Sequence, residues 1–133
     1  MHFLALIVSL QLAVAAILDP STAASGKSPQ IALSNKITAC PGKVQREQQL
    51  LTEFLDQVRQ NEPGVLEFEL SLAPQDNVFL TYEIYANQHA IDIHLNTTYF
   101  AHLINAEQAE GTKCANNSVI IPLSKVYSIR RGH

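Results

Sequence analysis

The sequence has few of the features that mark common chemical sites. It has no tryptophan, two cysteines and five glycines, so it is neither a disulfide-dense miniprotein nor a low-complexity chain. Its net charge is only −3 and it shows no basic stripe, which argues against nucleic acid as a partner. A glycine-rich phosphate loop, a G-x-S-x-G turn and metal-ligand spacing are all missing, so we expect no metal and no cofactor.

One long apolar run is present, and it lies at the N-terminus. Residues 3–18 carry no charge and end in an alanine-rich stretch of the small-x-small form that signal peptidase recognises. The run is shorter than the roughly 20 residues of a membrane span. We therefore expect a signal peptide over 1–18, a flexible mature N-terminus over 19–30 and one domain over 31–130, with no membrane contact after cleavage. The alternative for the apolar run is a buried first strand or helix.

Two further features agree with export. Asn96 and Asn116 each begin an N-glycosylation sequon, Asn-Thr-Thr and Asn-Asn-Ser. An even pair of cysteines, Cys40 and Cys114, indicates one disulfide in an exported chain; the alternative is two unpaired, partly buried thiols. The sequence thus predicts a secreted, extracellular glycoprotein from a eukaryotic secretory route.

Hydrophobic spacing predicts strands and helices in a fixed order. Apolar residues alternate over 31–39, 66–72 and 78–86, as they do in half-buried strands. Between the first two strands, apolar residues recur at helical spacing, while Glu47 and other charged residues lie off that stripe. The apolar stripe comprises Leu51, Phe54, Leu55 and Val58, and Glu62-Pro63-Gly64 is expected to end the helix.

The C-terminal half adds a second helical region and a last strand. Asn87 and Thr98 are the expected caps of two helical segments, and Gly111 is expected to end the second one. The last strand is expected over 119–129, where Pro122 requires an edge or a bulge. The resulting order, β-α-β-β-α-β, is the ferredoxin-like α+β arrangement.

The usual strand order of this fold brings the two cysteines together. The first strand lies between the third and the fourth and is antiparallel to the fourth. Cys40 closes the first strand and Cys114 shortly precedes the fourth, so the fold and the disulfide support each other. Such a bond would stabilise the protein by roughly 4 kcal/mol in the chain-entropy model.

Over about 31–129 the chain resembles antibiotic biosynthesis monooxygenase domains, as a secreted, fungal-like member. Four motifs carry the resemblance: Ile37-Thr38-Ala39-Cys40-Pro41-Gly42-Lys43, Glu62-Pro63-Gly64-Val65-Leu66, Leu80-Thr81-Tyr82-Glu83-Ile84-Tyr85, and Ala90-Ile91-x-x-His94-Leu95-x-x-x-x-Phe100. The resemblance implies a dimeric α/β barrel, in which two sheets face each other and each subunit has a pocket between sheet and helices. A sheet covered by helices on one side would also leave an apolar face, which favours a homodimer.

The resemblance further implies a type of chemistry. Oxygenases of this family oxidise quinols, anthrones or similar electron-rich aromatics without metal or flavin. We therefore expect a secreted, cofactor-independent monooxygenase acting on a small cyclic or phenolic/quinol-type metabolite. Because the family also includes haem-degrading oxygenases, sugar-phosphate isomerases and members without known activity, a non-catalytic binder of a small apolar ligand and a haem-handling protein are alternatives.

His94 is the first candidate for catalysis. It shares the inner face of its helix with Ala90 and Ile91, where a near-neutral imidazole could take a phenolic proton. The alternative is a core histidine bonded to the third strand, at Glu83. Glu83 is charged within an apolar strand, so it needs a partner. It could orient His94 or form a structural ion pair.

Four more side chains complete the candidate site. Asn35 could hold a substrate oxygen or reduced dioxygen, or face water at the rim. In haem-degrading relatives an Asn stands at the matching place, seven residues before the turn glycine, Gly42. Tyr82 and Tyr85 fall on opposite faces of one strand, so one should line the pocket and the other should support the dimer or a helix contact. Phe100 is expected to point inward.

Overall fold

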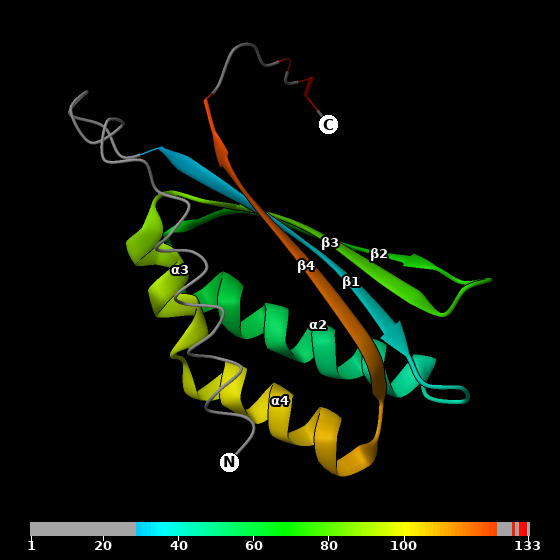
Figure 1. Ribbon diagram of the computed structural model, residues 1–133. Coiled ribbons are helices and arrows are strands. Elements are labelled where there is room, and N and C mark those ends of the chain that lie inside the picture. The colour runs from blue at the N-terminus through cyan, green and yellow to red at the C-terminus, as the bar shows by residue number, and fades with distance from the viewer. Residues whose placement is uncertain (1–28, 125–128, 130, 133) are drawn as a thin grey trace.

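The computed structural model describes residues 29–124, 129 and 131–132. They form two layers: a four-stranded sheet and, on one face of it, three helices (Figure 1). The predicted signal peptide, 1–18, and nearly all of the predicted flexible segment, 19–30, lie outside the described residues.

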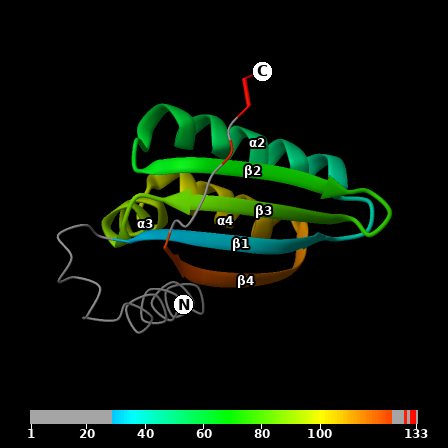
Figure 2. The ribbon, with the colours of Figure 1, turned by 90° about the horizontal axis from the view of Figure 1, so that it is seen from above.

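The sheet has the predicted strand order. Its strands are β1 (Gln30–Ala39), β2 (Val65–Ala73), β3 (Val78–Tyr85) and β4 (Lys113–Leu123). They lie side by side in the order β2-β3-β1-β4, and every neighbouring pair is antiparallel (Figure 2). The α+β ferredoxin-like prediction is therefore confirmed, with the first strand between the third and the fourth.

The three helices are α2 (Val44–Asn61), α3 (Gln88–Leu95) and α4 (Thr98–Glu110). Asn87 caps α3 as predicted, because its side chain accepts a hydrogen bond from the backbone N–H of Ala90. The cap of α4 is Thr97, whose hydroxyl accepts from the backbone N–H of Phe100, whereas Thr98 is the first helical residue. The predicted cap was one residue too late.

Gly111 ends α4 in a left-handed conformation, with φ of 62°. Two residues later β4 begins, six residues before the predicted start at residue 119. Its first half is polar and exposed, and its pairing with β1 depends on backbone hydrogen bonds, which leave no apolar alternation in the sequence. Pro122 lies in this edge strand, as expected of a residue without a backbone N–H.

Two individual burial predictions were wrong. Leu66 is 52% exposed, because a bulge between Val65 and Glu67 shifts the register of β2 against β3. Glu47 was placed off the apolar stripe of α2, yet it is 0% exposed, because the first turns of α2 pack against α4.

The disulfide prediction is confirmed. Cys40 and Cys114 are bonded, with their Cα atoms 5.0 Å apart. The backbone N–H of Cys40 donates to the carbonyl of Thr112 at 2.8 Å, so the junction between β1 and β4 is held by backbone contacts as well.

The sheet face opposite the helices has a set of exposed apolar side chains. We call it the open sheet face; it comprises Leu80, Tyr82, Val119 and Ile121. Tyr82 and Val119 both lie opposite Ser34 on the central strand, from either side, so they share one face. Four large apolar side chains exposed on one sheet face are unusual on a soluble monomer.

Candidate active site

A cavity of about 400 Å³ lies between the inner face of the sheet and the three helices. This volume falls in the range of small-molecule sites. Its wall is mainly apolar and draws on both layers, including Leu33, Leu51, Phe54, Phe68, Phe100 and Leu103. An apolar wall with a few fixed polar groups is typical of a site that binds a small organic molecule.

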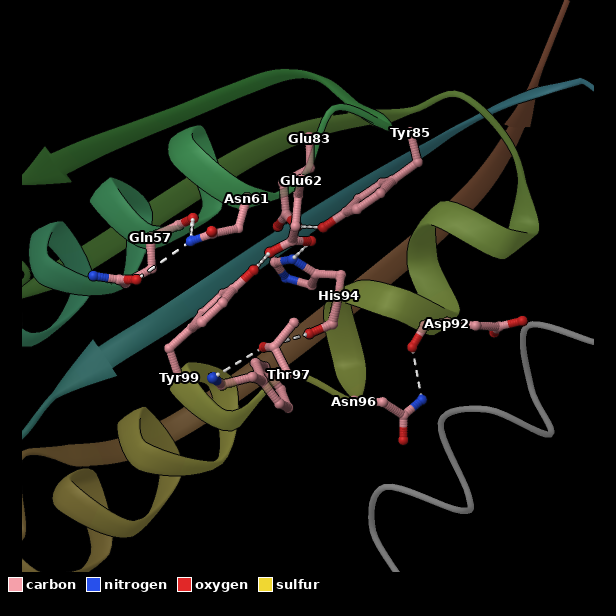
Figure 3. Close-up of polar contacts among 11 residues, drawn as sticks. Gln57, Asn61, Glu62, Glu83, Tyr85, Asp92, His94, Asn96, Thr97 and Tyr99 are labelled. Atoms are coloured by element: carbon pink, nitrogen blue, oxygen red, sulfur yellow. Dashed lines mark hydrogen bonds and ion pairs between the residues drawn. The ribbon is translucent and has the colours of Figure 1, made fainter.

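His94 lies in this wall, on the buried face of α3. Its Nδ1 is 2.9 Å from Oε1 of Glu62, the residue that ends α2. The hydroxyl of Tyr99, from α4, donates to the other oxygen of the same carboxylate at 2.6 Å. Figure 3 shows the imidazole and the phenol reaching Glu62 from neighbouring helices. His94 and Glu62 are both buried, so their contact is shielded from water.

This arrangement determines which ring nitrogen of His94 remains free to accept a proton. Burial raises the pKa of Tyr99, and its bond to Glu62 raises it further, so Tyr99 stays a donor. Because Glu62 is the acceptor for both neighbours, we place the proton of neutral His94 on Nδ1. Nε2 then has its lone pair free, and among the described residues it has no hydrogen-bond partner. Rings of Phe54, Tyr85 and Phe100 surround the imidazole at centroid distances of 5.3–5.7 Å.

Glu83 does not bond to His94. Its carboxylate accepts from Asn35 Nδ2 at 2.7 Å, from the Thr81 hydroxyl at 2.6 Å and from the Tyr85 hydroxyl at 2.6 Å. Burial raises the pKa of Glu83, while its hydrogen-bond donors act in the opposite direction. Glu83 therefore fixes the polar groups of the sheet wall rather than the imidazole, and the sequence-based choice of partner was wrong.

Asn35 lines the cavity, and its side-chain amide is already hydrogen-bonded to neighbouring residues. Nδ2 donates to Glu83 and, at 3.1 Å, to the Thr81 hydroxyl, while Oδ1 accepts from the Ser118 hydroxyl. The longer of the two donated bonds, to Thr81, is the one that a ligand oxygen could replace. Whether Asn35 contacts a substrate stays a prediction.

The structure separates the two tyrosines of β3. Tyr85 points to the helix side and is fully buried behind the cavity wall, with its pKa raised by burial and by Glu83. Tyr82 is 46% exposed on the open sheet face, away from the cavity. Of the remaining candidates, Phe100 lines the cavity, Asn96 is exposed at the end of α3, and Asn116 is exposed at the cavity edge on β4.

Sequence reasoning missed Glu62 and Tyr99 as partners of His94. The segment Glu62-Pro63-Gly64 was interpreted only as a helix end. Among the described residues, no three His, Cys, Asp or Glu side chains are placed to hold a metal ion. None of the helices in that part of the chain is both long and apolar enough to cross a membrane.

Comparison with known proteins assigns the family. Residues 30–106, more than half of the chain, match the family described as antibiotic biosynthesis monooxygenase. The chain belongs to this family. No curated protein matches it.

Solved structures agree with this family assignment. A Caulobacter crescentus protein named for the antibiotic biosynthesis monooxygenase family is 21% identical, with a TM-score of 0.66 over 74% of this chain and 92% of its own. A Pseudomonas aeruginosa protein is 22% identical, with the same TM-score, over 74% of this chain and 98% of its own. A Bacteroides thetaiotaomicron protein, also named for the family, is 21% identical, with a TM-score of 0.62 over 74% and 97%. At these identities the likeness concerns the fold.

Proposed function

We propose that this protein is a cofactor-independent monooxygenase that oxidises a small cyclic or phenolic/quinol-type metabolite. One observation carries the proposal: His94 lines a mainly apolar cavity, its Nδ1 is held by Glu62, and its Nε2 is left free. A neutral imidazole braced in this way by a carboxylate is the arrangement of a general base. Membership of the monooxygenase family agrees with it.

The proposed reaction uses the substrate as the reductant. Nε2 of His94 takes the proton of a phenol or enol, and Glu62 stabilises the imidazolium that forms. The electron-rich anion then reacts with dioxygen. For a ring methylene, conversion to a carbonyl supplies all four electrons that dioxygen needs: one oxygen atom enters the product and the other leaves as water. Tyr99 keeps Glu62 in place through its 2.6 Å bond.

The sheet wall would stabilise the developing charge. Asn35 is held by Glu83 and Thr81, so its amide has a fixed position before a substrate arrives. Exchange of the Thr81 bond for a substrate or dioxygen oxygen would place one donor against negative charge. Loss of one such donor typically costs about 10²–10³-fold in rate.

Oxygen uptake with an anthrone or quinol probe tests the function. We expect wild type to consume oxygen with a chelator present, and His94→Ala to lose about 10²–10⁴-fold in turnover. His102→Ala is the matched control, because His102 is an exposed histidine on α4. Thermal unfolding of each variant separates lost chemistry from lost folding. His94→Ala with full activity per folded molecule would remove the base from the proposal.

Non-catalytic binding is the second candidate. The polar groups of the sheet wall are already bonded to one another, as they would be in a site that only encloses an apolar ligand. Ligand binding without oxygen uptake would favour this function. A Soret band on titration with haem would instead point to haem handling.

We also propose that the mature protein is a secreted, glycosylated homodimer. The apolar N-terminal run, the two sequons and the disulfide support export. The open sheet face supports back-to-back pairing of two copies, and proteins of this family are commonly dimeric. N-terminal sequencing of material from a culture medium should find a start near residues 16–20, and a chain that still begins at Met1 contradicts cleavage.

A further inference from the structure

The cavity is elongated along β1. Glu83 lies opposite Leu33, and Lys113 lies opposite Ala39, six residues further along the same strand. At a strand rise of about 3.3 Å per residue, the two positions are roughly 20 Å apart. At one end of the lining Glu83 and His94 are buried, whereas at the other end Gln108 is exposed and Lys113 is half-buried. Asn116 and Ser118 continue this exposed edge along β4 towards Asn35. The mouth therefore lies between α4 and the first half of β4.

Lys113 is the only lysine or arginine among the described residues that line the cavity. Its Nζ lies 2.6 Å from Oε2 of Glu107, which lines the same end of the cavity from α4. About a quarter of the Lys113 side chain is exposed, whereas the Glu107 side chain is almost fully buried. The ammonium is thus the charged group of this pair that an incoming molecule can reach.

Glu107 is not a permanent counter-ion for Lys113. It lies beside Glu47, a fully buried carboxyl from α2 whose oxygens have no donor from the other described residues. Burial and the neighbouring Glu47 carboxyl raise the pKa of Glu107 to about 7, although Lys113 acts in the opposite direction. Glu107 is therefore partly protonated close to neutral pH, where its charge does not fully balance that of Lys113. The nearby Arg46 and Glu110 are exposed and already paired with each other at 2.7 Å.

We propose that Lys113 determines the specificity of this cavity by binding a carboxylate at one end of an elongated aromatic ligand whose hydroxyl end reaches His94. The inference deepens the function proposed above and rests on it for the His94 end. The ligand carboxylate takes the place of Glu107 at the ammonium, and Glu107, having lost that partner, takes up one proton from solvent. Exposed amides of Gln108 and Asn116 lie at the same mouth and suit an anionic, hydrogen-bonding group.

Calorimetric titration with two matched probes tests this. The probes are a hydroxybiphenyl carboxylate, with hydroxyl and carboxylate at opposite ends, and the corresponding carboxamide, which has nearly the same shape without the charge. We expect wild type to bind the carboxylate about 10–100-fold more tightly, as one charge-assisted contact would produce. Lys113→Met should abolish the preference for the carboxylate and still bind the carboxamide. Lys113→Arg should retain the preference for the carboxylate.

Lys43→Met is the control, because Lys43 is an exposed lysine at the start of α2, away from the cavity lining. It should keep the full preference. Titrations in buffers of different ionisation enthalpy should show proton uptake with the carboxylate in wild type and not in Glu107→Gln. The inference is overturned if wild type binds both probes equally, if it binds neither, or if Lys113→Met retains the preference. The carboxylate preference needs no turnover, so an inactive protein that shows it refutes the monooxygenase function alone.

Discussion

Replacing Glu47 with glutamine should change the stability of the protein on one side of neutral pH only. Glu47 is 0% exposed and lies beside Glu107 across the contact between α2 and α4, where it helps to raise the pKa of Glu107. Glutamine has nearly the same shape, and its amide can donate to Glu107 permanently. The substitution therefore replaces a donor that depends on pH with one that does not.

The sign follows from the raised pKa of Glu107. An unfolded carboxyl titrates at 4.5 and the folded Glu107 at about 7, so between these values the native state holds a proton that the unfolded chain has released. The free energy of unfolding should fall as the pH rises through this window. At 1.36 kcal/mol for each pKa unit, the loss amounts to about 3 kcal/mol. Glu83 also has a raised pKa, but its effect is common to both proteins and cancels in their difference.

Urea unfolding followed by circular dichroism, with the disulfide intact, measures the effect. We expect Glu47→Gln to match wild type near pH 5 and to exceed it by about 1–3 kcal/mol near pH 8. Glu53→Gln, an exposed substitution on the same helix, should stay within about 0.5 kcal/mol of wild type at both values. An equal shift at both pH values, or a destabilised variant at the higher one, refutes the effect of Glu47 on the pKa of Glu107.

Three further substitutions test the packing, the disulfide and the dimer. A Cβ on Gly64 would lie 2.6 Å from the Cβ of Ala90, so Gly64→Ala should lower the free energy of unfolding by about 1–3 kcal/mol. Adding Ala90→Gly should recover part of this loss, and an unchanged urea midpoint for Gly64→Ala contradicts the expected clash. Replacing Cys40 and Cys114 together with serine should cost about 4 kcal/mol in the same measurement, and a change near zero would show that the closed loop contributes little. Tyr82→Arg should convert a micromolar dimer to monomer in light scattering, and a wild type that is already monomeric removes the dimer proposal.

The sequence predicts elements whose buried faces repeat regularly. The alternation over 31–39 and the helical spacing around Phe54 identify β1 and α2 because one face of each lies against the core. The first half of β4 carries no such signal. Most of Lys113 to Ser118 is polar and exposed, and its register with β1 is set by backbone pairing rather than by a buried apolar face. A strand of this kind can be inferred from topology but not from side-chain pattern.

In the candidate site, too, only the residue that lies in an apolar pattern could be predicted from the sequence. His94 could be predicted because its helical face is apolar. Glu62 could not, because it stands 32 residues earlier at a helix end, and only the packing of α3 and α4 against that end brings it to His94 and Tyr99. Glu47 was placed on the solvent side of α2 because a carboxylate usually lies there. Its burial follows from the packing of α2 against α4, a helix distant in sequence that also carries Glu107.

The disulfide changes the outcome of proteolysis, because it keeps the two pieces of a cleaved chain joined. The bond between Cys40 and Cys114 closes a covalent ring that contains α2, β2, β3, α3 and α4. A single backbone cut inside the ring, for example in the exposed turn at Pro74–Asp76, opens the ring without detaching a fragment. Both ends stay joined to β1 and β4, which pair with each other outside the ring. Once nicked by a protease, the molecule would keep its full mass until a reductant cleaves the disulfide.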